Sequence, residues 1–92
     1  MYVILVYDIC SDANGQKVLS KTFKTYKKYL THIQNSVFEG EISQGNIIKL
    51  KNELSMVIRH DMDSVILFKS RNEKWLEKEI WARDDDVMSN FL

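Results

Sequence analysis

The chain has 92 residues, of which 45% are hydrophobic and 28% are charged, as is typical of one small globular domain. Thirteen basic residues balance thirteen acidic ones, so the net charge alone does not indicate a nucleic-acid-binding protein. The single cysteine excludes a disulfide framework and a cysteine metal cluster, and it fits a cytoplasmic protein. The apolar opening, MYVILVY, is too short for a membrane span, so we expect no membrane association.

Residues 2–8, with the sequence YVILVYD, are predicted to form a β-strand. Both faces are apolar until Asp8, which is typical of a strand covered on both sides. The helices of so small a chain can cover one side of a sheet, and a second copy of the chain is the simplest cover for the other. A carboxylate at the end of a buried strand is costly without a partner, a metal or water. Asp8 is therefore the first candidate for chemistry, and a solvated acid that caps a loop is the alternative.

A helix is predicted over residues 14–30, with Ser11 or Asp12 as its N-cap. Its two faces separate by helical periodicity into an apolar stripe and a basic stripe. No acid interrupts residues 14–35, so the basic stripe could contact phosphates, although a solubilising surface is an equal alternative. The apolar stripe consists of Leu19, Phe23, Tyr26 and Leu30, and the basic stripe of Lys17, Lys21, Lys24 and Lys28.

Residues 32–42 are predicted to be extended, with a bend or a split into two strands near Asn35–Ser36. Ser43 is expected to cap a second helix over residues 44–59, and a strand is expected at 64–69. Residues 74–81 fit either a helix or a strand. We expect solvated surface at two segments, the loop from His60 to Asp63 and the acidic run at 84–86. Cys10 is expected to be chemically inert.

This order of elements predicts one α+β domain over residues 1–92, a ferredoxin-like two-layer sandwich. The antiparallel sheet would carry two helices on one face and leave the other face for a second protomer. Two copies of Asp8 that meet across the twofold axis would repel each other unless a cation lay between them. Mg²⁺, or Mn²⁺ in its place, suits such carboxylates.

Three segments together resemble a known family: YVILVYDI at 2–9, SVFEGE at 36–41 and DSVILF at 63–68. In this order and spacing they resemble the small CRISPR-associated endonuclease, the second core subunit of the spacer-acquisition machinery. The resemblance covers roughly residues 1–70. It implies a homodimer with a ferredoxin-like core at 1–70 and a segment, 71–92, that includes a C-terminal strand paired with the partner's sheet.

The same resemblance implies site residues and partners. Asp8 matches the family's metal-binding aspartate, Tyr7 the tyrosine before it and Phe38 the phenylalanine of the SVF motif, so these three are the candidate catalytic residues. Lys17, near the start of the first helix, and His32, before the second strand, stand where some relatives carry arginine, which weakens the expectation of vigorous cleavage. The implied partners are an integrase subunit and duplex DNA or single-stranded RNA.

Two main functions follow from these features, and two others remain open. One is a metal-dependent endonuclease on RNA or double-stranded DNA. Because each chain has only one candidate acid, cleavage is expected to be slow or vestigial. The second is a non-catalytic DNA-binding adaptor of the integrase complex. A toxin-type ribonuclease of related fold and a small-molecule-binding regulatory domain are the others, and the acid-free lysines argue against the latter.

Overall fold

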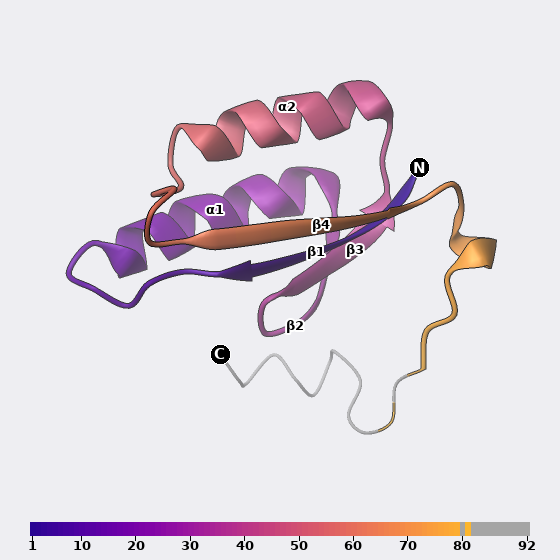
Figure 1. Ribbon diagram of the computed structural model, residues 1–92, viewed down its shortest axis with the longest axis horizontal. Helices are drawn as coiled ribbons and strands as arrows, with labels where there is room; N and C mark the ends of the chain where they lie inside the picture. Colours follow the sequence, from indigo (N-terminus) through magenta and orange to yellow (C-terminus); the bar gives the residue numbers. More distant parts are fainter. Residues whose placement is uncertain (80, 82–92) are drawn as a thin grey trace.

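The computed structural model describes residues 1–79 and 81 and has an α+β fold of two layers (Figure 1). Four antiparallel strands form one sheet in the order β2-β3-β1-β4, and both helices lie on the same side of it. This confirms the predicted ferredoxin-like sandwich. The elements are β1 (Tyr2–Asp8), α1 (Gly15–Tyr29), β2 (Thr31–Gln34), β3 (Val37–Glu41), α2 (Gln44–Ser55), β4 (Ser64–Ser70) and a 3₁₀ turn, η1 (Glu73–Trp75).

Strand β1 lies in the middle of the sheet, paired with β3 on one side and β4 on the other. Alternate residues of a strand point to opposite faces, and one face of β1 is buried under the helices. Leu5 pairs with Phe38 and with Leu67, so the three strands supply neighbouring side chains to the core on this face. The buried residues of this core are Val3, Leu5, Tyr7, Tyr26, Leu30, Phe38, Ile42, Leu50 and Leu54.

The other face of the sheet has no helix over it, and it is apolar where β1 and β4 pair at Ile4 and Val6. Ile4 pairs with Phe68 and Val6 pairs with Ile66, which places these four side chains together on this face. Ile66 is 50% exposed and Phe68 is 57% exposed in the single chain. We call these four residues the open-face patch. The expectation that β1 and β4 are covered on both sides is thus not met within one protomer.

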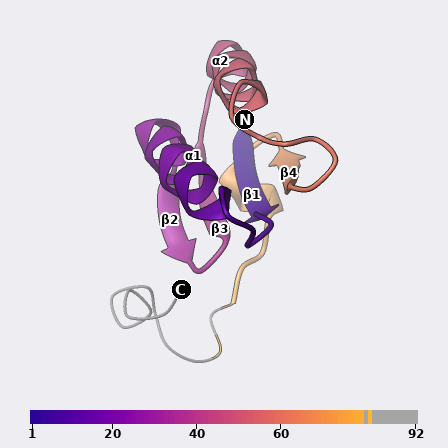
Figure 2. The same ribbon diagram turned by 90° about the vertical axis from the view of Figure 1, so that its left-hand side faces the viewer.

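The extended segment splits into a hairpin, which is one of the two arrangements that the sequence predicts. Asn35 adopts a φ of 36°, in the left-handed region that asparagine tolerates better than most residues. The pairing is irregular between His32 and Gln34, so β2 carries a bulge next to the turn. The β2–β3 hairpin lies below α1 (Figure 2).

Both helices form, but their ends differ from the prediction. Helix α1 begins after Asn14, whose side chain makes no capping hydrogen bond, and the predicted caps lie two to three residues too early. Ser43 caps α2 as predicted, since its hydroxyl accepts a hydrogen bond from the Asn46 backbone. Helix α2 ends at Ser55 and not at 59. The backbone N–H of Arg59 donates to a side chain outside the helix, which a continuing helix would not allow.

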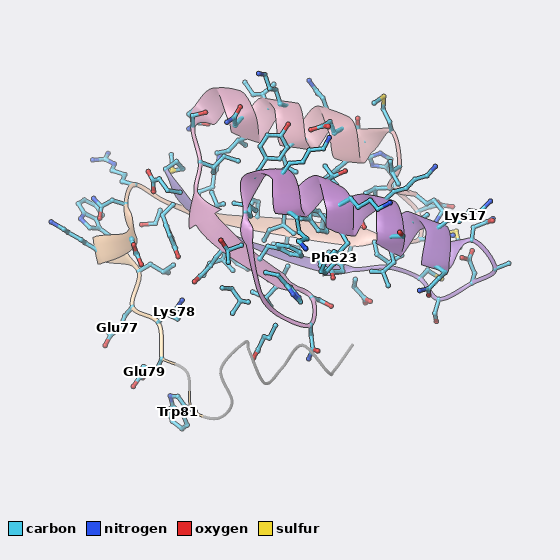
Figure 3. All side chains as sticks on the ribbon, turned by 180° about the vertical axis from the view of Figure 1, so that it is seen from behind. Lys17, Phe23, Glu77, Lys78, Glu79 and Trp81 are labelled. Carbon is cyan, nitrogen blue, oxygen red and sulfur yellow. The ribbon has the colours of Figure 1, made fainter. Side chains whose placement is uncertain are left out.

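The segment after β4 makes one 3₁₀ turn, and residues 76–79 have no regular secondary structure. The strand expected at 74–81 is therefore not formed in the described part of this single chain, because a strand needs a second strand to pair with. Lys78 instead forms an ion pair with Glu39 on β3 (Figure 3). The predicted pairing with a partner protomer stays a prediction, and residues 82–92 lie outside the described residues. No helix in the described part of the chain is long and apolar enough to cross a membrane.

Candidate functional site

Asp8 is exposed at the end of β1, where it follows the open-face patch. It is the last β1 residue paired with β4, opposite Ser64. Among residues 1–79 and 81, no ion pair or hydrogen bond involves its side chain. The strand pairing fixes the backbone of Asp8, while its carboxylate is available to a ligand.

A groove of about 760 Å³ opens beside Asp8, between the first half of α1 and the β2–β3 hairpin. Its wall on α1 combines the apolar Leu19 and Phe23 with the polar Gln16, Ser20 and Lys24, and its wall on the hairpin includes His32. The groove is open to solvent along its length, so an extended ligand could enter it. The polar residues that line the groove include Asp8 at its mouth, Gln16, Ser20, Lys24, His32 and Ser36.

His32 faces this groove from β2 and is held in place by three contacts. Its Nε2 lies 2.9 Å from the backbone oxygen of Asn35. A carbonyl can only accept, so Nε2 carries a proton and Nδ1 is left to face a ligand. The imidazole packs 4.8 Å from the ring of Phe38 and 5.0 Å from that of Phe23. Figure 3 shows Phe23 beneath α1, on the side that faces the sheet.

Tyr7 and Phe38, the other two candidate catalytic residues, belong to the core. Phe38 is fully buried, and Tyr7 points to the helix face, opposite to Asp8. The Tyr7 hydroxyl donates to the Asn35 backbone oxygen at 3.2 Å, and burial raises the pKa of this phenol. Its ring lies 4.9 Å from that of Tyr26. In this arrangement both aromatic residues shape the floor behind the groove, and their catalytic role stays a prediction.

The predicted basic stripe of α1 is exposed, and its members differ in what they contact. Lys28 is paired with Glu53 of α2 at 2.6 Å, and a hydrogen bond with Glu53 raises the pKa of this lysine. Lys17, at the start of α1, points away from the sheet (Figure 3). Lys17, Lys21 and Lys24 make no ion pair among the described residues. These three lysines are therefore free to contact a polyanion, whereas Lys28 is partly neutralised.

The described part of one chain does not supply a complete metal site. No group of three or more potential ligands occurs among the described residues. Asp12, the acid nearest to Asp8 in sequence, is paired with Arg59 at 2.5 Å, and the hydrogen bond with Arg59 lowers the pKa of Asp12. The exposed carboxylate of Asp8 fits a hard cation such as Mg²⁺ or Mn²⁺. Since Asp12 is already paired, a second protomer is the simplest source of another carboxylate.

Sequence reasoning missed the importance of Asp63, which was expected to lie in a solvated loop. Its side chain is fully buried and receives hydrogen bonds from Arg59 and from the backbone of Cys10. The spacing of Arg59 and Asp63, four residues apart and directly before a strand, was the available signal. Their contacts connect the segment after α2 to the loop after Asp8.

A sequence profile of the family described as CRISPR associated protein Cas2 matches residues 1–78. The chain is 54% identical to a CRISPR-associated endoribonuclease Cas2 of Fusobacterium nucleatum, over all of this chain and 87% of the relative. It is 42% identical to a CRISPR-associated endoribonuclease Cas2 of Moorella thermoacetica, over 98% of this chain and all of that protein.

Two solved structures have the same fold. The crystal structure of Streptococcus pyogenes Cas2 at pH 6.5 superposes with a TM-score of 0.72 at 27% identity, over 86% of this chain and 99% of that chain. A structure described as a crystal structure of cas2 gives a TM-score of 0.77 at 33% identity, over 91% of this chain and 88% of that one. The three motifs, the fold and the full-length relatives agree, and the chain belongs to the Cas2 family of CRISPR-associated proteins.

Proposed function

We propose that this protein acts in CRISPR spacer acquisition in the cytoplasm as a homodimeric, metal-dependent endonuclease. The two Asp8 carboxylates, one from each protomer, would together hold one Mg²⁺ or Mn²⁺ ion. The substrate would be RNA. The observation that carries the proposal is the exposed carboxylate of Asp8, which makes no ion pair or hydrogen bond among residues 1–79 and 81, at the mouth of a groove lined by Lys24 and His32. The relatives described as endoribonucleases support the choice of RNA.

The open-face patch supports the homodimer. Ile66 and Phe68 are half exposed and lie next to Ile4 and Val6. An apolar patch of this kind is stabilised when a second sheet covers it. Asp8 lies two residues after Val6 and four after Ile4 along β1, so its side chain points to the same face as theirs. A symmetric dimer through this face would therefore bring one Asp8 carboxylate from each chain toward the axis.

The chemistry divides between the bound ion, the lysines of α1 and His32 of the groove. A divalent ion supplies Lewis acidity and a more acidic bound water, which phosphodiester hydrolysis requires. Lys17, Lys21 and Lys24 would bind backbone phosphates without reading sequence. His32 would contact the substrate through Nδ1, since its Nε2 is already committed to Asn35. With one carboxylate per chain, we expect slow single-metal cleavage and not two-metal catalysis.

The test is cleavage of single-stranded RNA and duplex DNA with Mg²⁺, with Mn²⁺ and with EDTA. Asp8→Asn removes the charge with little change in shape, and it should abolish metal-dependent cleavage. Asp61→Asn is the matched control, because Asp61 is an exposed acid in the loop before β4. Equal cleavage by the wild type and Asp8→Asn would refute the proposed site.

A DNA-binding adaptor of the integrase complex is the second candidate. The three unpaired lysines of α1 favour it, because they suit the sequence-independent binding of a duplex. The replacement of arginine by Lys17 and His32 at the matching positions also favours binding over cleavage. If Asp8→Asn supports spacer acquisition together with the integrase subunit at the wild-type level, the adaptor is the working function.

A further inference from the structure

Arg59 and Asp63 form a connected cluster in the segment between α2 and β4. The Asp63 carboxylate receives two hydrogen bonds from one edge of the Arg59 guanidinium, at 2.9 Å from Nε and 3.0 Å from Nη2. The same carboxylate accepts the backbone N–H of Arg59 at 3.0 Å. The Asp63 side chain is fully buried and that of Arg59 is 20% exposed. Such a paired and hydrogen-bonded arrangement satisfies charges that would otherwise be costly to bury.

The cluster reaches across to the loop that follows Asp8. Asp63 Oδ1 accepts the backbone N–H of Cys10 at 2.9 Å, and Arg59 Nη2 donates to the backbone oxygen of Cys10 at 3.1 Å. Arg59 Nη1 donates to the carboxylate of Asp12 at 2.5 Å. Cys10 lies two residues after Asp8. Its backbone N–H and its backbone oxygen are therefore bound by side chains 53 and 49 positions away in sequence.

The loop is also enclosed from the side of α1. A Cβ atom placed on Gly15 would lie far inside van der Waals contact with the backbone oxygen of Cys10. Only glycine lets the start of the helix approach this closely. The Cys10 carbonyl thus lies between the first residue of α1 and the Arg59 guanidinium, with little freedom to move in either direction.

The same cluster constrains Asp8 through its strand partner. Asp63 directly precedes Ser64, which pairs with Asp8 in the β1–β4 ladder. The position of Asp8 is consequently fixed in two ways. The β1–β4 hydrogen bonds hold its strand, and Arg59 and Asp63 hold the backbone of Cys10 two residues later. In metal sites, groups that orient a ligand in this way contribute strongly to affinity without touching the ion.

We propose that Arg59 and Asp63 are positioning residues that hold the loop from Cys10 to Asp12 and thereby fix the Asp8 carboxylate for metal binding. This inference rests on the proposed function of Asp8. It also assigns Asp12 to the Arg59 cluster and not to the metal site. In this assignment Arg59 and Asp63 would act through the loop and would not contact the ion themselves.

The test compares Asp63→Asn and Arg59→Lys with the wild type. Asp63→Asn keeps an acceptor for the Cys10 backbone but loses the charge that pairs with Arg59. Arg59→Lys keeps a positive charge, but a single ammonium group could not bridge Asp63, Asp12 and the Cys10 oxygen together. The matched control is Ser43→Ala, which removes the α2 cap and lowers stability away from the loop. For all proteins we would measure Mn²⁺ binding by electron paramagnetic resonance, the half-saturating Mg²⁺ for cleavage and the melting temperature.

We expect Mn²⁺ affinity to fall and the half-saturating Mg²⁺ to rise by roughly tenfold in both cluster variants, the loss typical of removing a ligand-orienting group. The rate at saturating Mg²⁺ should change much less. Ser43→Ala should lower the melting temperature and leave the metal requirement unchanged.

Two results would overturn the inference, and they have different meanings. If the wild type binds Mn²⁺ through Asp8 and both cluster variants bind it equally well, the positioning role is refuted while the metal site stands. If the wild type binds no more Mn²⁺ than Asp8→Asn, the metal site itself is refuted, and the positioning role with it.

Discussion

Replacing Phe68 on the open-face patch tests the homodimer most directly. An aromatic side chain buries about 150–250 Å², and Phe68 is 57% exposed in one protomer. Roughly 100 Å² per protomer is therefore left for a partner to cover. At about 25 cal/mol per Å², this is ~2.5 kcal/mol per protomer and ~5 kcal/mol for a symmetric dimer.

Phe68→Ala would remove most of this area, so we expect the dimer to weaken by about a thousandfold, since 1.4 kcal/mol corresponds to a factor of ten. Phe68→Glu should have a larger effect, because two carboxylates would be desolvated on the same apolar face. The protomer fold should persist in both variants, as the side chain contributes little to the core of the single chain.

The assay is sedimentation equilibrium over a concentration series, with circular dichroism to confirm the fold. Ile48→Glu is the matched control, because Ile48 on α2 is 60% exposed but lies in the helical layer. The control should remain dimeric. A Phe68→Glu protein that stays dimeric at the wild-type concentration range would refute the assignment of this face as the dimer interface.

Three further predictions concern the stability of the fold. Hydrogen bonds from Arg59 hold the pKa of Asp63 well below its usual range, so this carboxylate contributes stability that is present above the ordinary Asp pKa and lost as the pH falls below it. Urea unfolding at pH 7 and pH 3 should show a smaller loss at low pH for Asp63→Asn than for the wild type, and equal losses would contradict this. Phe38→Ala should cost about 3–5 kcal/mol by urea unfolding, because the ring is fully buried among aromatic side chains; a cost under ~1 kcal/mol would argue against this packing. Gly15→Ala should destabilise the protein by about 1–3 kcal/mol, since the new Cβ would collide with the backbone of Cys10; an unchanged unfolding midpoint would show that the loop can move aside.

Much of the fold could be predicted because its signals are local. The apolar stripe of α1 appears in the structure as predicted, with Tyr26 and Leu30 buried and Phe23 partly covered. The split of the extended segment near Asn35 follows from a residue that tolerates positive φ. In both cases the residues that determine the structure are neighbours along the chain.

The candidate site was predicted only in part. Asp8 is a candidate because an acid ends an apolar strand; the structure shows it exposed, and its metal-binding role stays a prediction. Helical periodicity places the lysines of α1 on one face and does not distinguish among them. In the structure, the packing of α1 against α2 pairs Lys28 with Glu53, whereas Lys17 makes no ion pair among the described residues. The partner of a surface charge depends on how helices pack, and periodicity carries no information about it.

The sequence by itself determined the two-layer α+β architecture, the two faces of β1 and the place of Asp8 at the end of that strand. Three-dimensional packing alone sets the pairing of Asp12 with Arg59, 47 positions away, and the hydrogen bond from Cys10 to Asp63, 53 positions away. Periodic patterns arise from neighbouring residues, but a hydrogen-bonded cluster forms only when the sheet brings distant loops together.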